Sequence, residues 1–407
     1  MKILLVHNAY QQPGGEDIVF RHECNLLRRF GHNVTTYERS NYEVDSYTGF
    51  ARLGLVKDVV WNSHSRRQFT QLLKDTRPDV VHVHNTFMMI SPAMYAACQE
   101  TEVPVVQTLH NYRLLCPAAN LFRDGHPCEE CMTHSLVRGI AHACFRESFV
   151  ATATVACMLK VHRVLGTWQN AVSAYVALSN FSKQRFIAGG LPQEKIIIKP
   201  NFVEPDPGPR TSDGEYALFI GRLSAEKGLH TLLAAWKHTP HVPLVIVGDG
   251  PLLSELQACA GRLELHNIVF RGRLPRHETE AALKNARFLV QPSECYENFP
   301  MTVVEAFACG APVICSRLGA LQEIVNDGQT GLHFNPGDSE DLAAKIDWAW
   351  QHREATLAMG QRARREFEAK YTAEQNYRQL VDLYRRVLAT RSPSESCAVT
   401  QPAAVRA

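Results

Sequence analysis

Residues 216–228 read YALFIGRLSAEKG, and this stretch determines the fold of the second half of the chain. The apolar run Tyr216–Ile220 predicts a buried β-strand, and Gly221 and Gly228 bound a short loop that leads into a helical pattern. A strand, a loop and a helix in this order begin a βαβ unit, whose next strand lies parallel to the first. The stretch therefore predicts an α/β domain built on a parallel sheet.

The same alternation of short apolar runs and longer amphipathic stretches extends over most of the chain. The strands predicted in the first half are Lys2–His7, Asn33–Glu38, Asp79–His84, Val103–Leu109, Ala174–Leu178 and Lys195–Lys199. Those predicted in the second half are Tyr216–Ile220, Leu244–Val247, Ile268–Arg271, Phe288–Gln291, Pro312–Ser316 and Gly331–Phe334. The predicted helices include Glu16–Phe30, Ser339–Gln351, Arg353–Lys370 and Thr372–Ala389. The expected fold class is α/β, with two tandem Rossmann-like, doubly wound domains.

A proline-rich segment, Val203–Pro209, separates the two halves and predicts a linker over residues 203–215. The first domain is then 1–202 and the second is 216–371. Residues 372–390 predict a C-terminal helix that is a candidate to cross back to the first domain, and 391–407 predict a disordered tail. Because ligands bind outside the carboxyl ends of the strands in such sheets, we expect the functional site in a cleft where the two domains face each other.

The 407 residues are 45% hydrophobic and 21% charged with a net charge of +2, which excludes a disordered chain and predicts no nucleic-acid partner. No apolar run reaches the roughly 18–20 residues that span a bilayer. The apolar stretch near the N-terminus is too short for a signal peptide, so we expect a cytoplasmic protein. Most of the 12 cysteines stand singly in apolar segments and predict buried thiols.

The loop after the first strand of the second domain carries two cations. Arg222 and Lys227 are five residues apart near a predicted helix N-terminus, where a phosphate group is favoured. Gly221 lets the backbone approach such a ligand closely. The loop therefore fits a diphosphate clamp, and a glycine turn with two solvated charges is the alternative.

Two glutamates follow the fourth strand of the second domain. Glu297 is predicted on the loop after that strand, and Glu305 on the helix that begins near Pro300, on a face directed at the same pocket. A carboxylate accepts hydrogen bonds from two adjacent hydroxyls, which suits a ribose or a hexose. The apolar neighbours of Glu305 argue against an ordinary surface position for this residue.

In their order and spacing, these motifs resemble the C-terminal domain of the family 4 glycosyltransferases, which are retaining enzymes of the GT-B fold. The resemblance rests on G-R-L-x4-G with its lysine, the turn Gly248–Pro251, and the E-x7-E pair that leads into A-x-A-C-G-x-P-V-I. In the first half, Pro13–Glu16 resembles the family's glycine loop. Thr108–Asn111 resembles the segment whose histidine, here His110, lies beside the donor sugar.

The resemblance implies that Arg222 and Lys227 hold the donor's diphosphate, that Glu305 binds the ribose and that Glu297 contacts hydroxyls of the donor sugar. Many members have glycine where this chain has Pro300, so the backbone contact there must come from one of its neighbours. The expected catalytic residues are Glu297, His110, Arg222 and Lys227. The expected donor-binding residues are Gly14, Gly15, Gly221, Arg222, Lys227, Asn298, Phe299, Met301 and Glu305.

The reaction that the resemblance implies is hexosyl transfer from a nucleoside-diphosphate sugar to a glycan or lipid-linked acceptor, with retention of configuration, in surface polysaccharide biosynthesis. Neither set of loops has a paired-aspartate motif for a metal, so we expect catalysis without a cofactor, with the leaving phosphate as the group that accepts the acceptor's proton. A sugar-nucleotide epimerase of similar architecture and a non-catalytic assembly subunit stay open as alternatives.

A polar insertion over residues 111–146 contains Cys116, Cys128, Cys131 and Cys144. Thiolates two residues apart can bind one side of a tetrahedral Zn²⁺, and two thiolates from flanking segments can complete the site. A loop with little apolar content has no core of its own, so a structural zinc would hold its shape. Free or redox-active thiols are the alternative. Substitute ligands are available at His126, His134 and His142.

The stretch Phe149–Trp168 has an apolar face interrupted by Lys160, His162 and Arg163. With positive charge added by the pair Arg66–Arg67, this stretch would let the first domain lie on the inner surface of an anionic membrane, near a lipid-linked acceptor. An ordinary core helix of the first domain is the alternative.

Overall fold

The first domain is built on a six-stranded sheet in which every neighbouring pair of strands is parallel. In the computed structural model, which describes residues 1–11, 14–47 and 51–390, the strand order is β2-β1-β3-β4-β7-β8. The strands are β1 (Lys2–Ala9), β2 (Asn33–Ser40), β3 (Val80–Val83), β4 (Val105–Thr108), β7 (Ala174–Ala177) and β8 (Ile196–Ile198). The inner strands β3, β4 and β7 are buried along their whole length because helices cover both faces of the sheet.

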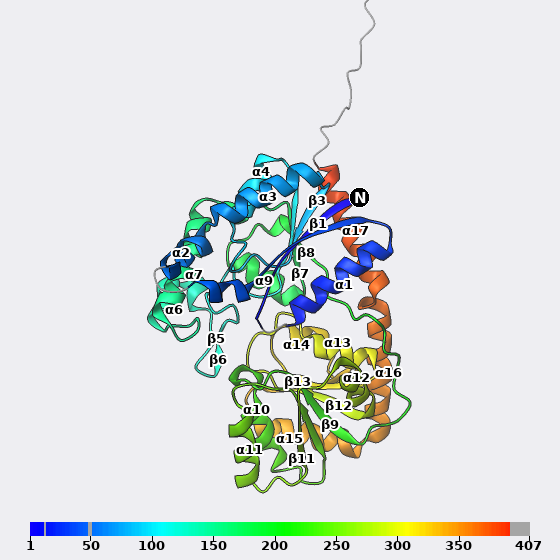
Figure 1. Cartoon of the computed structure of the whole chain (residues 1–407). Coiled ribbons are helices and arrows are strands. Elements are labelled where there is room, and N and C mark those ends of the chain that lie inside the picture. Colours follow the sequence, from blue (N-terminus) through cyan, green and yellow to red (C-terminus); the bar gives the residue numbers. More distant parts are fainter. Residues whose placement is uncertain (12–13, 48–50, 391–407) are drawn as a thin grey trace, which may run out of the picture.

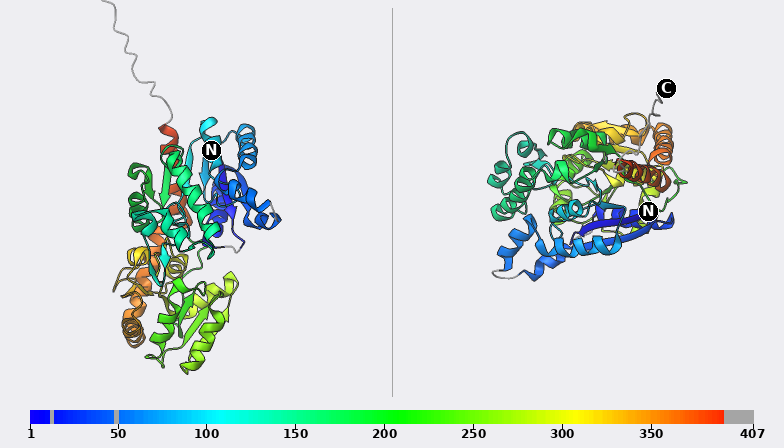
Figure 2. Two further views of the ribbon diagram at one scale, coloured as in Figure 1. Left: turned by 90° about the vertical axis from the view of Figure 1, so that its left-hand side faces the viewer. Right: turned by 90° about the horizontal axis from the view of Figure 1, so that it is seen from above.

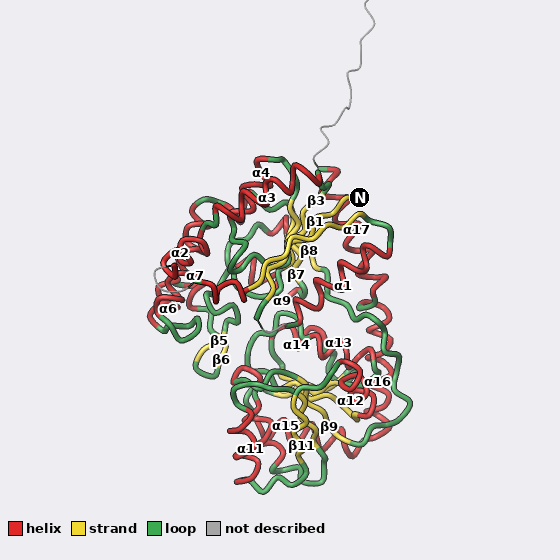
Figure 3. Tube along the Cα trace, viewed as in Figure 1, coloured by secondary structure: helices red, strands yellow, loops and turns green. Residues whose placement is uncertain are grey.

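Two apolar cores lie on the two faces of this sheet. One core contains Leu4 and Phe69, and the other contains Ile3 and Phe20. Figure 3 shows the sheet surrounded by helices. These are α1 (Gly15–Arg29), α2 (Ala51–Val60), α3 (Ser63–Thr76), α4 (Ala93–Glu100), α7 (Phe149–Val164), α8 (Thr167–Asn170) and α9 (Asn180–Ala188).

The second domain repeats this plan with the strand order β11-β10-β9-β12-β13-β14, again all parallel. Its strands are β9 (Tyr216–Ile220), β10 (Leu244–Val247), β11 (Ile268–Gly272), β12 (Ala286–Gln291), β13 (Val313–Ser316) and β14 (Gly331–Phe334). Its helices are α10 (Leu229–Trp236), α11 (Leu253–Arg262), α12 (Arg276–Asn285), α13 (Met301–Ala308), α14 (Gly319–Ile324), α15 (Ser339–Gln351) and α16 (Arg353–Lys370). The order reverses between β9 and β12, which is where such sheets bind ligands.

The last described helix, α17 (Ala373–Ala389), leaves the second domain and packs on the first. Leu380, Tyr384 and Val387 share a core with Ile3 and Phe20 of the N-terminal segments. Figures 1 and 2 show the two domains stacked, with α16 beside the second domain and α17 beside the first. The chain therefore crosses between the domains twice, once near residue 203 and once between α16 and α17.

The α/β fold class and all twelve predicted strands are confirmed, with bounds that shift by at most a few residues. The predicted helix Phe149–Trp168 is divided into α7 and α8 because Gly166 takes a left-handed conformation (φ 65°). The insertion contains a hairpin and two short helices that the sequence analysis did not identify: β5 (Phe122–Arg123), β6 (His126–Pro127), α5 (Glu130–Thr133) and α6 (Leu136–Ala141). The tail predicted over 391–407 lies outside the described residues.

None of the described helices combines the length and the apolar character that crossing a bilayer requires.

Candidate functional site

Glycines let two strand-end loops of the second domain lie directly against each other. A Cβ atom at Gly248 would lie 1.8 Å from the carbonyl oxygen of Gly221, and one at Gly250 would lie 2.4 Å from that of Leu223. The amide of Leu223 donates to the carbonyl oxygen of Asp249 over 3.0 Å. The loops after β9 and β10 therefore form one backbone surface that any larger side chain would separate.

That surface forms part of a cavity of about 630 Å³ between the two domains. Gly14 of the first domain lines it together with Arg222, Arg273 and Asp249 of the second. No described residue makes an ion pair or a side-chain hydrogen bond with Arg222 or Arg273, whereas Asp249 accepts a hydrogen bond from the amide of Gly250 over 2.7 Å. Two unpaired guanidinium groups in one cavity favour an anionic ligand such as a diphosphate.

A second cavity, of about 370 Å³, adjoins the first and shares Arg273 with it. Glu305 and Met301 of α13 line this cavity from the second domain, and Ile18 and His22 of α1 line it from the first. Burial raises the pKa of Glu305, although Arg276 acts in the opposite direction. Hydroxyl groups that donate to Glu305 would stabilise its charged form, so this position fits the ribose that the sequence analysis assigns to it.

Lys227 and Glu297 form an ion pair, with 2.5 Å between Nζ and Oε1. The hydroxyl of Ser293 donates to the same oxygen over 2.7 Å. Burial acts to raise the pKa of Glu297, but the pair with Lys227 and the hydrogen bond from Ser293 outweigh it and lower the pKa. Burial likewise opposes the charge on Lys227, but Glu297 raises the pKa of the ammonium. Both groups are therefore charged at neutral pH, with Lys227 neutralised by a neighbour while Arg222 is not.

Contacts between two loops fix the geometry of this pair. Gly228, at the start of α10, has a left-handed backbone (φ 66°), and a Cβ there would lie 1.9 Å from the carbonyl oxygen of Pro292. The hydroxyl of Thr231 donates to Glu294 over 2.6 Å, and the amide of Glu294 donates to the carbonyl oxygen of Glu226 over 2.9 Å. The contacts between the loops after β9 and β12 thus hold Lys227 and Glu297 close enough to form their ion pair.

Asn298 and Phe299 place their side chains at the junction between the domains. The Asn298 side chain is buried and donates to the carbonyl oxygen of Leu109 over 2.6 Å. Phe299 packs against cores of both domains. That these residues bind the donor stays a prediction, since the Asn298 amide nitrogen is used in the contact with Leu109 while its oxygen is buried without a partner. Gly15 belongs to the same junction, since a Cβ there would lie 3.6 Å from Cγ of Met301.

His110 follows Leu109 and lies beside this junction. Its Nε2 is 2.9 Å from Nδ1 of His84, which follows the neighbouring strand β3. Burial lowers the pKa of His110 well below its ordinary value, so the ring is neutral at physiological pH. Asn298 contacts Leu109, and His110 and Glu297 are the sequence neighbours of these two residues. That both contact the donor sugar stays a prediction.

The sequence analysis predicts that Glu297 and Glu305 face the same pocket, but in the structure they do not. Glu305 lines the 370 Å³ cavity, whereas Glu297 lines neither of the two cavities and points to Lys227 and Ser293. Arg273 lines both cavities and is a candidate functional residue that the sequence analysis does not name. The signal was present, because Arg273 follows a correctly predicted strand, Ile268–Arg271, on the edge of the sheet where ligands bind.

The four cysteines of the insertion gather in one region. Burial raises the pKa of Cys131 to about 12, and Cys116, Cys144 and Cys128 add to the rise. No three of their sulfur atoms lie within 4.8 Å of one another in the described residues. The insertion also differs from its expectation in having apolar contacts, because Leu115, Leu121, Leu136, Cys116 and Cys131 join the core of the first domain. The three candidate histidines, His126, His134 and His142, are exposed.

Comparison with known protein families identifies both halves of the chain. The family Glycosyltransferase Family 4 matches residues 13–207, and the family Glycosyl transferases group 1 matches residues 204–366. The two matches meet at the linker between the domains. The chain belongs to the family 4 glycosyltransferases of the GT-B fold.

The curated relatives of this glycosyltransferase act on different sugars. A sulfoquinovosyl transferase of Arabidopsis thaliana is 26% identical over 309 residues, which are 72% of this chain and 54% of the relative. A D-rhamnosyltransferase of Pseudomonas aeruginosa is 35% identical over 41% of this chain and 42% of the relative, and an O-antigen chain mannosyltransferase of Escherichia coli is 32% identical over 45% and 49%. The chain thus spans about half the length of these relatives.

Solved structures share the fold over nearly the whole glycosyltransferase. Anabaena HepE in complex with UDP has a TM-score of 0.70 at 19% identity and covers 95% of this chain and 100% of its own. Sucrose-phosphate synthase from Thermosynechococcus elongatus has a TM-score of 0.70 at 18% identity and covers 96% and 99%. At this level of identity the likeness establishes the fold.

Proposed function

We propose that this glycosyltransferase moves a hexosyl group from a nucleoside-diphosphate sugar to a glycan or lipid-linked acceptor, with retention of configuration, in the synthesis of a surface polysaccharide. The observation that carries the proposal is the pair of adjoining cavities, one with two unpaired arginines and the other with Glu305. Arg222 and Arg273 suit a diphosphate, and Glu305 suits the ribose next to it. The UDP complex of HepE and the mannosyl and rhamnosyl relatives support the same donor class.

The charges of the site suit cleavage of the bond between the sugar and the diphosphate. Departure of the diphosphate builds negative charge, which Arg222 stabilises directly. Lys227 shares its charge between Glu297 and the phosphate, so a bound donor completes a cluster of two anions around one ammonium. Positive charge that develops on the sugar is stabilised by Glu297. In this mechanism the leaving phosphate accepts the proton of the acceptor hydroxyl on the same face, which retains the configuration.

A screen of nucleoside-diphosphate sugars by thermal shift tests the proposed donor class. A donor present at about 100 times its Kd stabilises the folded protein by about 2.7 kcal/mol, which raises Tm by several degrees. We expect one nucleotide class to raise Tm, and Glu305→Gln to reduce the shift mainly by weakening binding of the ribose. Glu278→Gln, which changes an exposed carboxylate of α12 outside both cavities, is the matched control that retains the shift. If no nucleoside diphosphate changes Tm, the proposed donor site is wrong.

We also propose that the cysteines of the insertion bind a structural zinc. Four thiols gather in one region, although no three of their sulfur atoms lie within 4.8 Å of one another, whereas Zn–S bonds of 2.3 Å imply about 3.8 Å between sulfur atoms in a tetrahedral site. Metal binding would therefore require the sulfur atoms to move together.

Elemental analysis of protein purified without chelators tests the zinc. We expect about one zinc per chain, lost when Cys128 and Cys131 are both replaced by serine and retained in Cys157→Ser, which changes an exposed thiol of α7. Protein that is free of metal and fully active would contradict this proposal.

The apolar residues of α7 are divided between two faces. Val155, Met158 and Leu159 are buried in the core of the first domain, as the core-helix alternative expects. Phe149 and Val150, at the start of the helix, are 62% and 71% exposed. We propose that this exposed end contacts an anionic membrane, with Arg146 and Lys160 as its cations. Arg66 contributes less than expected, because it pairs with Glu100.

Flotation with vesicles that contain anionic lipid tests this contact. We expect salt-sensitive binding that Val150→Glu weakens. Val269→Glu is the control, because Val269 is also a half-exposed apolar residue but lies on β11 of the second domain. Absence of binding at low salt would exclude the membrane contact.

A further inference from the structure

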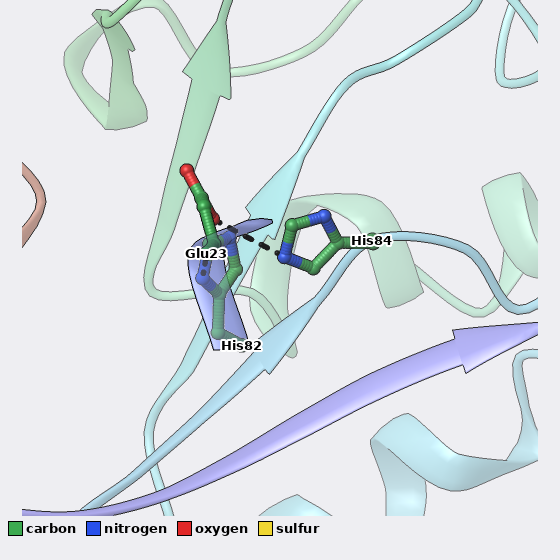
Figure 4. Close-up of side chains that lie close together, drawn as sticks. All are labelled: Glu23, His82 and His84. Atoms are coloured by element: carbon green, nitrogen blue, oxygen red, sulfur yellow. Dashed lines mark ion pairs between the residues drawn. The ribbon is translucent and has the colours of Figure 1, made fainter. Parts of the chain in front are cut away.

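A buried group of polar side chains lies next to the site, between the first sheet and α17. Glu23, His82 and His84 have ligand atoms within 4.8 Å of one another, the one such group of three in the described residues (Figure 4). The group does not suit a metal ion. The ammonium of Lys199 donates to Glu23 Oε1 over 2.7 Å and would repel a cation there. Both ring nitrogens of His82 are already bonded, Nδ1 to the hydroxyl of Tyr384 and Nε2 to that of Thr108.

Glu23 sets the directions of the hydrogen bonds in this group, because an ionised carboxylate can only accept them. Burial acts to raise its pKa, but Lys199 and His84 hold the pKa well below its ordinary value. With the Asn376 amide oriented to satisfy both of its groups, its nitrogen donates to Oε1 of Glu23 over 3.3 Å and its oxygen accepts from Lys199 over 2.6 Å. Oε1 therefore has two donors, and an ionised Oε2 can only accept.

The remaining oxygen determines the protonation of His84. Oε2 of Glu23 and Nε2 of His84 are both buried and lie 3.3 Å apart, and neither has a hydrogen-bond partner among the described residues. Because the ionised carboxylate can only accept, a hydrogen on Nε2 of His84 is the arrangement that gives both atoms a partner. Burial lowers the pKa of His84, which leaves the ring neutral. A neutral ring with its hydrogen on Nε2 has a bare lone pair on Nδ1.

That lone pair determines the protonation of His110 in turn. Nδ1 of His84 is 2.9 Å from Nε2 of His110, so His110 must donate from Nε2. Its own Nδ1 then carries a lone pair. Nδ1 of His110 makes no hydrogen bond to a described residue. It also does not belong to the fully buried polar atoms without a partner, so it is accessible on the side away from the stacked ring of His84.

We propose that Glu23 and His84 are positioning residues that hold His110 as its Nε2–H tautomer, so that His110 offers the donor sugar a hydrogen-bond acceptor and no donor. The inference rests on the proposed function, since it places the sugar beside Glu297 and His110, where Asn298 and Leu109 join the domains. It also goes further, because it defines the chemical class of the sugar at that point.

The acceptor nitrogen Nδ1 of His110 restricts which groups of the donor sugar can lie against it. A sugar hydroxyl can donate to Nδ1, whereas a carboxylate or sulfonate group has no hydrogen to donate and would meet a lone pair. The donor is therefore a neutral sugar with a hydroxyl at this position, as opposed to a uronic acid or a sulfonated sugar. Anionic sugars should be poor donors even when they carry the right nucleotide.

The tautomer can be observed without any substrate. Two-bond ¹H–¹⁵N spectra of protein with ¹⁵N-labelled histidine rings distinguish the two neutral tautomers, and the signals of His110 are those that vanish in His110→Gln. We expect the Nε2–H pattern in the unaltered chain. The Nδ1–H pattern would overturn the inference.

Glu23→Gln should invert the tautomer. The two donors at Oε1, Lys199 and Asn376, would take the new amide oxygen, and the amide NH₂ would then face Nε2 of His84. His84 must then carry its hydrogen on Nδ1, and His110 in turn must accept on Nε2 and carry its hydrogen on Nδ1. We expect the Nδ1–H pattern for His110 and about tenfold lower kcat/KM with a hydroxyl-bearing donor. An unchanged tautomer would contradict the relay.

His84→Phe provides a second test that does not depend on how Glu23→Gln folds. It keeps a ring of similar size and removes the acceptor, so His110 should become a mixture of tautomers, whereas His84→Gln keeps a donor and an acceptor and should restore the Nε2–H form. His82→Phe is the matched control, because it removes two buried hydrogen bonds from the same group and leaves His110 unchanged. A pure Nε2–H signal in His84→Phe would overturn the inference.

The two proposals fail differently. The expected tautomer in a chain without measurable transfer would leave the relay standing and count against the proposed function. Efficient transfer by a chain whose His110 has the opposite tautomer would overturn the relay and leave the proposed function standing.

Discussion

Replacing Arg222 with alanine should lower kcat/KM for sugar transfer by about 100-fold. A charge-assisted hydrogen bond to phosphate contributes about 1.5–3 kcal/mol, and more when the site closes around the donor. Arg222 lines the cavity between the domains and has no partner in the described residues, so its charge is available in full. Because it is exposed and makes no structural contact, Tm without ligand should stay within about a degree.

Steady-state kinetics with the donor found by thermal shift measures this effect. Arg262→Ala removes an exposed arginine at the end of α11, away from both cavities, and should leave turnover unchanged. Lys227→Ala should also lose most turnover, but with a fall in stability, because it leaves Glu297 without its ion-pair partner. Near-normal activity of Arg222→Ala would exclude the diphosphate clamp.

The contrast between these two cations shows what the sequence can and cannot predict. The spacing of Arg222 and Lys227 after an apolar strand places both at the carboxyl edge of a parallel sheet, and the structure confirms that location. The partner of Lys227 lies 70 residues away, on the loop after β12, and no local pattern encodes that pairing. Backbone topology is readable from periodicity, because parallel strands must be apolar on both faces. Side-chain partners depend on how two loops meet.

The domain junction shows the same limit. Asn298 stands in a motif that resembles a donor-binding loop, yet its side chain bonds to Leu109 of the other domain. The insertion was expected to lack a core because its composition is polar, but a few apolar residues, Leu115 and Leu121 among them, suffice to attach it to the first domain. Composition averages over a segment, whereas burial is decided residue by residue.

The tautomer relay lies entirely beyond sequence reasoning. Glu23 occupies an ordinary position on an amphipathic helix, His82 lies on β3, and His84 directly follows that strand. Three segments and α17 must come together before Glu23 faces Lys199 and the histidines. Such a group is recognised only when each donor and each acceptor can be assigned a partner.

Glu297→Gln should lower turnover without weakening donor binding. The substitution keeps the shape of the side chain and removes its charge, so the developing positive charge on the sugar loses its counter-charge and kcat should fall by about 100-fold. Lys227 simultaneously loses the carboxylate that neutralises it, which leaves its full charge for the diphosphate. The Kd of the intact donor should therefore hold or decrease while kcat falls.

Calorimetric titration of the donor beside single-turnover kinetics measures the two quantities independently. Glu294→Gln is the matched control, because Glu294 stands on the same loop and accepts a hydrogen bond from Thr231 without contacting Lys227. It should lower Tm slightly and leave kcat unchanged. If Glu297→Gln instead raises Kd at constant kcat, and Glu305→Gln lowers kcat at constant Kd, then the two glutamates have exchanged roles, and Glu305 is the residue next to the reacting sugar.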